Sequence, residues 1–323
     1  MTDISLRRPI GDMVCPSVHG QLPSLERLPV EIIRDVFEFA AWSDKRTATA
    51  LDRVNHTIHG WMNRPIYEEV ILHDPYSLVT FSEVIRQAPG IPHSSESPSP
   101  PGQFPGLHAH PLSIARDFAF FRDTVKYLSV MHVNIPFHHV RNIFIVCAGV
   151  RVLEIDNPYL PFPPTTMQPS ELIMGGIKPD IFASQMFRNV SRLWLASASP
   201  AITRILEYPP QLEYIAIPLR VGGHRRIRVE DEARILTAMA LTSVELIIIN
   251  IEKAYTYLTT KPQYWVPRAE EVWRDALYHI QDSRLLVRVP EDLAEEPELA
   301  RKQGMSIWDR ATHDGVRHPV FTL

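Results

Sequence analysis

Few residues of the chain have the types and spacing that chemistry requires. Cys15 lies in a proline-containing start, and Cys147 lies in the apolar stretch IFIVCAG, where we expect a buried structural thiol. His138 and His139 are adjacent and point to different faces of a helix, whereas a metal pair needs i, i+4 spacing. The sequence has no G-x-S-x-G elbow, no Walker-type glycine loop and no paired C-x-x-C. We therefore expect no catalytic residues, no metal and no cofactor, and an enzyme on an α/β core is the less favoured alternative.

One basic cluster has the composition to bind an acidic partner. It begins at Arg220, continues through the segment GGHRRIR and stops at the acidic run 230–232. Guanidinium groups pair well with carboxylates and phosphates, so this cluster predicts a contact with an acidic or phosphorylated partner. The alternative is a solvated loop that neutralises the start of the next helix. Nucleic acid is not the expected partner, because no aromatic residues are interleaved and the net charge is −4. The candidate substrate-binding residues are Arg220, Arg225, Arg226 and Arg228.

The elements that must position these residues belong to a chain of 323 residues, 45% hydrophobic and 22% charged. This length predicts about two domains and a sizeable core. Prolines outnumber glycines by 29 to 13, which disfavours nucleotide-binding classes that need glycine loops. Two cysteines fit a reducing compartment, so we expect a cytoplasmic or nuclear location. The most apolar run, VELIIINI, is too short to span a membrane, and we expect neither a targeting segment nor a membrane partner.

Two windows concentrate the prolines. Residues 88–111 hold seven prolines and four serines with few apolar side chains, which predicts a flexible linker. Residues 158–181 hold six prolines together with several apolar residues, which predicts an insertion that lies against the fold. Residues 1–20 are expected to be disordered.

Between these segments, residues 21–87 predict a small helical module. The stretch LPVEIIRDVFEFAA has apolar residues at helical spacing. Ser43 or Asp44 is expected to cap a second helix, Pro65 to end it, and Asp74-Pro75 to start another. The apolar face of the second helix would consist of Ala48, Leu51, Val54, Ile58 and Trp61.

From residue 112 to 323 the pattern changes to a six-residue motif with apolar residues at positions 1, 4 and 6. Helical stretches separate most copies, and strand–helix units of about 20 to 40 residues are typical of a stacked βα solenoid. The longest gap between copies contains the window 158–181. An ordinary α/β sheet is the alternative. The copies are VKYLSV, VRVLEI, VSRLWL, LEYIAI, VELIII and the weaker DSRLLV, which begin at Val125, Val150, Val190, Leu212, Val244 and Asp282.

Residues 28–72 resemble an F-box. The matching features include Leu28-Pro29, Val36-Phe37, the acidic turn at Asp44 and the closing Pro65-Ile66-Tyr67. With irregular strand–helix repeats behind this segment, the chain is similar to the large family of fungal F-box-like proteins. The resemblance implies an α+β fold, with a three-helix F-box-like module at 21–87 and an irregular α/β leucine-rich-repeat-like solenoid at 112–323.

The resemblance also implies a function in ubiquitin transfer and proteasomal degradation. An F-box docks on the Skp-type adaptor of a cullin–RING (SCF) ligase, and the repeats recruit a target protein. A module this short also has too few core positions for all its apolar residues, so some are expected to meet a partner. A protein-interaction scaffold that works outside the ligase is the alternative. The residues that match the adaptor-contacting helix and its lead-in are Leu28, Pro29, Ile32, Val36 and Phe37.

Overall fold

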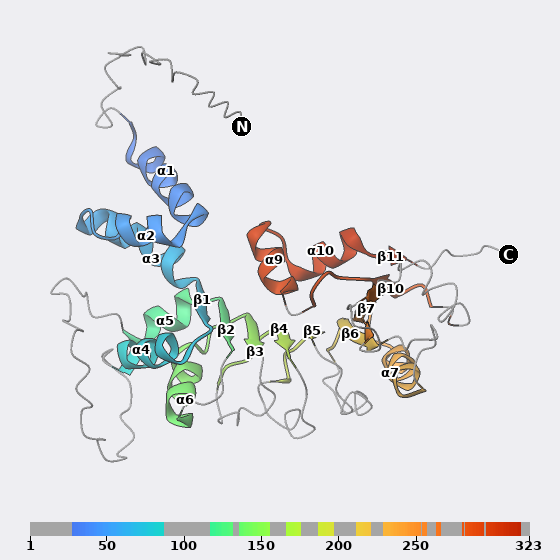
Figure 1. Cartoon of the computed structure of the whole chain (residues 1–323). Coiled ribbons are helices and arrows are strands. Elements are labelled where there is room, and N and C mark those ends of the chain that lie inside the picture. The colour runs from blue at the N-terminus through green and yellow to red at the C-terminus, as the bar shows by residue number, and fades with distance from the viewer. Residues whose placement is uncertain are drawn as a thin grey trace, which may run out of the picture. The chain divides into compact units, whose positions relative to one another are not determined.

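The protein is a mixed α/β chain whose helices accompany a largely parallel sheet (Figure 1). It divides into two compact units, Met1–Pro65 and Ile66–Leu323. The predicted disordered start 1–20 and linker 88–111 lie outside the described residues. The computed structural model describes residues 28–86, 117–131, 136–155, 166–175, 187–196, 211–220, 229–252, 254–256, 263–265, 280, 282–293 and 295–317.

The first unit contains α1 (Val30–Ser43), α2 (Lys45–Leu51) and most of α3 (His56–Tyr67). Asp44 caps α2, because its carboxylate accepts hydrogen bonds from the backbone N–H groups of Arg46 and Thr47, both at 3.1 Å. One of the two predicted caps is therefore confirmed.

The single helix predicted after this cap is in fact two helices. A second cap at Asn55, whose side-chain oxygen accepts the N–H of Ile58 at 2.9 Å, starts α3 after a short turn. Pro65 does not end the helix but lies inside the last turn of α3. Pro65 removes one N–H hydrogen bond from the helix, but the helix continues for two more residues to Tyr67.

The second unit is built on a nine-stranded sheet whose strand order follows the chain order. Its first eight strands pair in parallel, and the last pairs antiparallel with its neighbour. A separate antiparallel pair consists of β8 (Ala254–Thr256) and β9 (Gln263–Trp265). The strands of the large sheet are β1 (Glu69–Leu72), β2 (Tyr127–Val130), β3 (Val152–Ile155), β4 (Glu171–Met174), β5 (Arg192–Leu195), β6 (Tyr214–Arg220), β7 (Leu246–Glu252), β10 (Leu285–Arg288) and β11 (Val316–Arg317).

All six predicted motif copies are strands, namely β2, β3, β5, β6, β7 and β10. Positions 4 and 6 of each copy are buried on one face of the sheet, as Leu193 and Leu195 of β5 illustrate. Because side chains of a strand alternate between the two faces of a sheet, positions 4 and 6 lie on the same face. The motif therefore marks the residues of each strand that point toward the larger core.

The window 158–181, predicted as an insertion, contains a strand of the sheet. β4 pairs in parallel with β3 and β5, and its motif has Pro169 at the first position, followed by the buried Leu172 and Met174. The gap between Val150 and Val190 therefore divides at residue 169 into steps of 19 and 21 residues. The proline-rich window therefore contains a regular strand unit. Pro169 occupies the buried position before β4 that an aliphatic residue occupies in most other copies.

The boundary of the helical module also differs from the prediction of 21–87. β1 pairs with β2, and α4 (Pro75–Arg86) packs in the same core, so both belong to the second unit. The predicted start of this helix at Asp74-Pro75 is confirmed. Tyr67, Val70 and Leu72 follow the same motif as the later strands.

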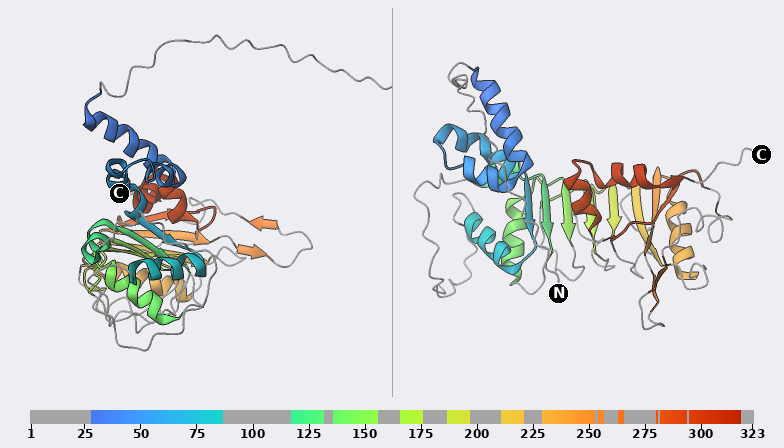
Figure 2. Two further views of the ribbon diagram at one scale, coloured as in Figure 1. Left: turned by 90° about the vertical axis from the view of Figure 1, so that its left-hand side faces the viewer. Right: turned by 45° about the horizontal axis from the view of Figure 1, so that its top comes forward.

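Helices lie on both faces of the sheet (Figures 1 and 2). The larger apolar core joins one face to α4, α5 (Phe118–Thr124), α6 (Phe137–Val146) and α7 (Val229–Ala240). A second, smaller core joins the opposite face to α9 (Glu296–Lys302) and α10 (Ile307–Asp314). Among the described residues, no helix is long and apolar enough to span a membrane.

Candidate protein-interaction surfaces

An apolar stripe runs along α1 and is open to solvent. Ile32, Val36 and Phe39 have exposed fractions of 46%, 58% and 75%. Their i, i+4, i+7 spacing places the three side chains on one side of the helix. We call these three residues the α1 stripe. Large apolar side chains that line up on one helix face and stay exposed are the usual mark of a binding surface.

The other side of α1 closes the core of the first unit. Ala41 is buried together with Ala48 of α2 and Met62 of α3. Phe37 is partly buried, and its ring centroid lies 6.4 Å from that of Trp61. The helix thus divides its apolar residues between an inner and an outer side.

The five predicted adaptor-contacting residues fall into two groups. Leu28, Pro29, Ile32 and Val36 are exposed, and the carbonyl of Pro29 accepts the N–H of Ile32 at 3.1 Å to start α1. Phe37 faces Trp61 instead, and the exposed aromatic residues of α1 are Phe39 and Trp42. The sequence contained this signal, because residue 39 completes the i, i+4, i+7 series that begins at Ile32.

The predicted apolar face of the second helix also divides. Ile58 is buried, whereas Val54 is exposed because it lies in the turn between α2 and α3.

The predicted arginine cluster is described only at its first member. Arg220 is the last residue of β6, where its backbone pairs with Glu252 of β7. Arg225, Arg226 and Arg228 lie outside the described residues. Their contact with an acidic substrate stays a prediction.

The second face of the sheet is covered by the chain segment that follows β10. We call residues 291–317, which carry α9, α10 and β11, the strap. Trp308 of the strap lies edge-on against Trp194 of β5, with ring centroids 5.4 Å apart, and its centroid is 5.8 Å from that of Tyr214 of β6. The side chains that form this core are Ile173, Trp194, Ala216, Ile248 and Leu286 from the sheet, and Leu293, Ala300, Ile307, Trp308 and Ala311 from the strap.

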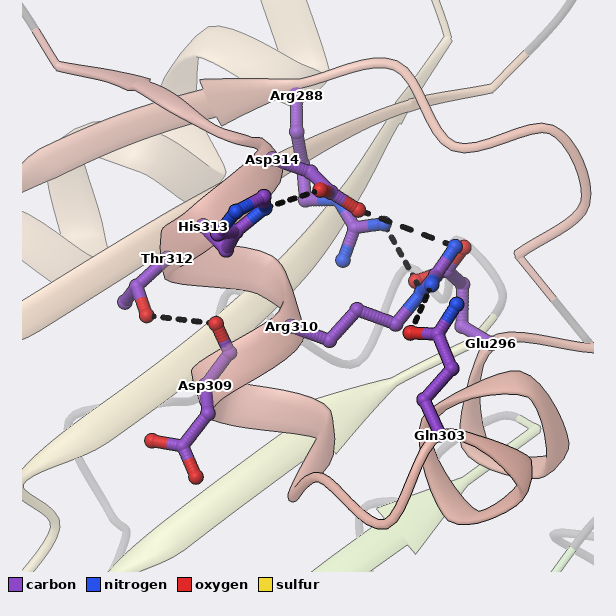
Figure 3. A network of polar contacts seen from close by, with 8 residues as sticks. All are labelled: Arg288, Glu296, Gln303, Asp309, Arg310, Thr312, His313 and Asp314. Atoms are coloured by element: carbon purple, nitrogen blue, oxygen red, sulfur yellow. Dashed lines mark hydrogen bonds and ion pairs between the residues drawn. The ribbon is translucent and has the colours of Figure 1, made fainter.

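Charged groups are buried beside this core (Figure 3). Arg288 of β10 and Glu296 of α9 form an ion pair, and their side chains are 2% and 1% exposed. Arg310 of α10 approaches the same carboxylate, with Nε 3.3 Å from Oε2, and it also donates to Gln303 at 2.6 Å. A carboxylate from the strap is therefore held between an arginine of the sheet and an arginine of the strap.

A second polar contact ties α9 to the first strands. Arg301 Nη1 lies 3.1 Å from Oε1 of Glu69 on β1, and its guanidinium lies 4.9 Å from the ring centroid of Tyr127 on β2. The hydroxyl of Tyr127 donates to Glu154 of β3. Burial, reinforced by the charge of Glu154, raises the pKa of Tyr127, so this hydroxyl stays protonated and serves as a hydrogen-bond donor.

Neither cysteine nor histidine chemistry is assembled in the described part of the chain. Burial raises the pKa of the Cys147 thiol to about 12, which leaves it unreactive. His139 is buried between α4 and α6, where Nδ1 lies 2.9 Å from the hydroxyl of Ser82. Within the described ranges, no group of three His, Cys, Asp or Glu side chains is placed to hold a metal ion.

Comparisons with models of known families, with curated proteins and with solved structures found no match to this chain.

Proposed function

We propose that this protein is the substrate-recognition subunit of an SCF-type cullin–RING ubiquitin ligase, working in the cytoplasm or nucleus. In this proposal the first unit is an F-box-like module that docks on the Skp-type adaptor, and the second unit recruits a target protein. The chain itself carries no catalysis. It brings the target near the ligase, so that ubiquitin transfer becomes effectively intramolecular.

The exposed α1 stripe is the observation that carries this proposal. The α1 stripe (Ile32, Val36 and Phe39) presents one apolar side, and helix-in-groove contacts use i, i+4, i+7 anchors of this kind. An aromatic anchor at the centre of such a contact contributes about 2 kcal/mol or more. The lead-in Leu28-Pro29 is exposed at the start of the same helix and extends the apolar surface.

The second unit supports the target-recruiting half of the proposal. Its parallel strands follow one another in chain order, and the steps between Val150, Pro169, Val190 and Leu212 are 19, 21 and 22 residues. Such regular units suit an irregular leucine-rich-repeat-like solenoid, in which each unit buries its apolar side against its neighbours. Solenoids of this type offer long surfaces for protein partners.

Co-purification of the full chain with a Skp-type adaptor tests the proposal. The wild-type chain is expected to retain the adaptor, and Ile32→Asp, Val36→Asp and Phe39→Asp are each expected to lose it. Val84→Asp is the matched control for Val36→Asp, since Val84 is an exposed valine of α4, 43% exposed, in the second unit. Unchanged circular dichroism would establish that the variants fold. An adaptor that fails to bind the wild-type chain would refute the proposal.

One observation favours a second candidate, a binding scaffold that works outside the ligase. Phe37 matches an adaptor-contacting position of the F-box but packs against Trp61. A scaffold would use the α1 stripe for a different helix-binding partner. This candidate gains support if the stripe variants abolish binding to a cellular partner while the adaptor binds neither them nor the wild-type chain.

A further inference from the structure

The two apolar cores of the second unit are separate. Along β5, Leu193 and Leu195 belong to the larger core with α4 to α7, whereas Trp194 points to the opposite face and to the strap. The residues that form the larger core include none from the strap. Lifting the strap would therefore open the smaller core and leave the larger one intact.

The interface under the strap contains buried polar atoms that are poorly satisfied. Asn250 of β7 is fully buried, and neither its amide oxygen nor its amide nitrogen has a partner among the described residues. The same holds for Nε and Nη1 of Arg288, the residue paired with Asn250 across the strands, and for Oε1 of Glu296. Each of these buried atoms has lost its contact with water without gaining a hydrogen bond, which destabilises the closed strap. A buried ion pair adds its own desolvation cost.

The backbone adds little to hold the strap down. β11 pairs with β10 through two residue pairs, Leu286 with Arg317 and Val287 with Val316. The neighbouring strands β6 and β7 pair along seven residues. A segment with few ladder bonds and a costly polar interface opens at a lower free energy than the whole domain.

We propose that the strap is a detachable cover, and that the sheet face beneath it binds a partner segment with the strap's own chemistry. The face presents the aromatic rings of Trp194 and Tyr214 beside the guanidinium of Arg288. From the strap, Trp308 packs against the ring of Trp194, and the carboxylate of Glu296 pairs with Arg288. The partner is therefore an amphipathic helix of a protein that carries an aromatic residue and a carboxylate on one side. In the ligase this face would bind the target, and that identification of the partner rests on the proposed function.

Hydrogen exchange of the full wild-type chain tests the detachment. Amides of α9 and α10 are expected to exchange about a hundredfold faster than those of β4 to β6, through an opening that is insensitive to low denaturant. Equal exchange of the strap and the central strands, through global unfolding alone, would overturn the proposal.

Binding of the strap in trans tests the face itself. A fluorescein-labelled peptide of residues 291–317 is added to the Glu296→Ala chain, in which Arg288 and Arg310 lose their carboxylate. This chain is expected to bind the peptide at least about tenfold more tightly than the wild-type chain, whose own strap competes. The same peptide with Trp308→Ala is the matched control and is expected not to bind.

Absence of peptide binding to a folded Glu296→Ala chain would overturn the proposal. If that variant does not fold, the exchange pattern of the wild-type chain decides alone. Neither experiment involves the adaptor, so its outcome is distinct from that of the co-purification test.

Discussion

The α1 stripe and the second face of the sheet are both apolar surfaces, but the chain covers only one of them within the described residues. On the sheet, Trp194 and Ile248 are buried under the strap. On α1, three quarters of the surface of Phe39 remains exposed to solvent. The difference separates two contributions: the face covered by the strap contributes to the stability of the closed chain, whereas the exposed stripe contributes little to stability and is the surface proposed for the adaptor.

Charged substitutions on the two surfaces give the largest contrast. Ile248→Asp places a carboxylate in the core under the strap and is expected to lower the free energy of unfolding by about 4 kcal/mol or more. Val36→Asp, on the exposed stripe, is expected to change it by less than about 0.5 kcal/mol. Urea denaturation followed by circular dichroism measures both. A large loss of stability in Val36→Asp would show that the stripe belongs to the folded core.

The buried ion pair gives the next contrast. Glu296→Met leaves Arg288 buried without its carboxylate and is expected to weaken closure of the strap by about 3 kcal/mol. Adding Arg288→Met replaces the pair by apolar side chains and is expected to restore closure to within about 1 kcal/mol of the wild type. Hydrogen exchange of α9 and α10 reports both values. Equally fast exchange of α9 and α10 in the single and double variants would show that the ion pair itself stabilises closure of the strap.

Two glycines allow a smaller, matched test. A Cβ on Gly149 would lie 1.9 Å from the backbone carbonyl oxygen of Arg122, which cannot move freely. A Cβ on Gly315 would lie 2.1 Å from the end of the Leu286 side chain and 2.8 Å from the carbonyl oxygen of Ala311. Gly149→Ala is expected to cost about 2 kcal/mol of global stability, and Gly315→Ala about 1 kcal/mol, confined to the strap. Thermal unfolding together with strap exchange separates the two.

Acidification is expected to act in opposite directions on the two faces of the sheet, with the smallest effects. On the strap face, burial raises the pKa of Glu171, so the folded state binds more protons than the unfolded state, and this residue's contribution to stability rises as pH falls. In α6, on the opposite face of the sheet, burial lowers the pKa of His139, so the contribution of His139 to stability falls as pH falls toward 5. Stability measured against pH in Glu171→Gln and His139→Gln isolates each contribution. Parallel pH curves for wild type and both variants would contradict the prediction.

The strands could be predicted well because burial on one face imposes a period of two on each copy of the motif. β4 was missed because Pro169 stands at the first position of its motif, inside a window whose prolines suggested an insertion. The sequence pattern places β1 in the helical module because only one residue separates it from the end of α3.

The strap could not be predicted, because nothing in residues 291–317 shows which distant strands they cover. One signal was present in the strands themselves: Ile173, Trp194 and Ile248 occupy the positions between the motif residues. A parallel strand that is apolar on both sides predicts that both faces of the sheet are buried. The inward turn of Phe37 depends on its pairing with Trp61, a contact between two helices that helical spacing alone does not specify.

Calorimetric titration of the full chain with a Skp-type adaptor tests the central claim most directly. The account predicts saturable binding by the wild-type chain and by Val84→Asp, and affinity at least about tenfold weaker for Val36→Asp and Phe39→Asp. Equal affinity of all four chains, or no binding by the wild-type chain, would contradict the assignment of the α1 stripe as the adaptor-binding surface.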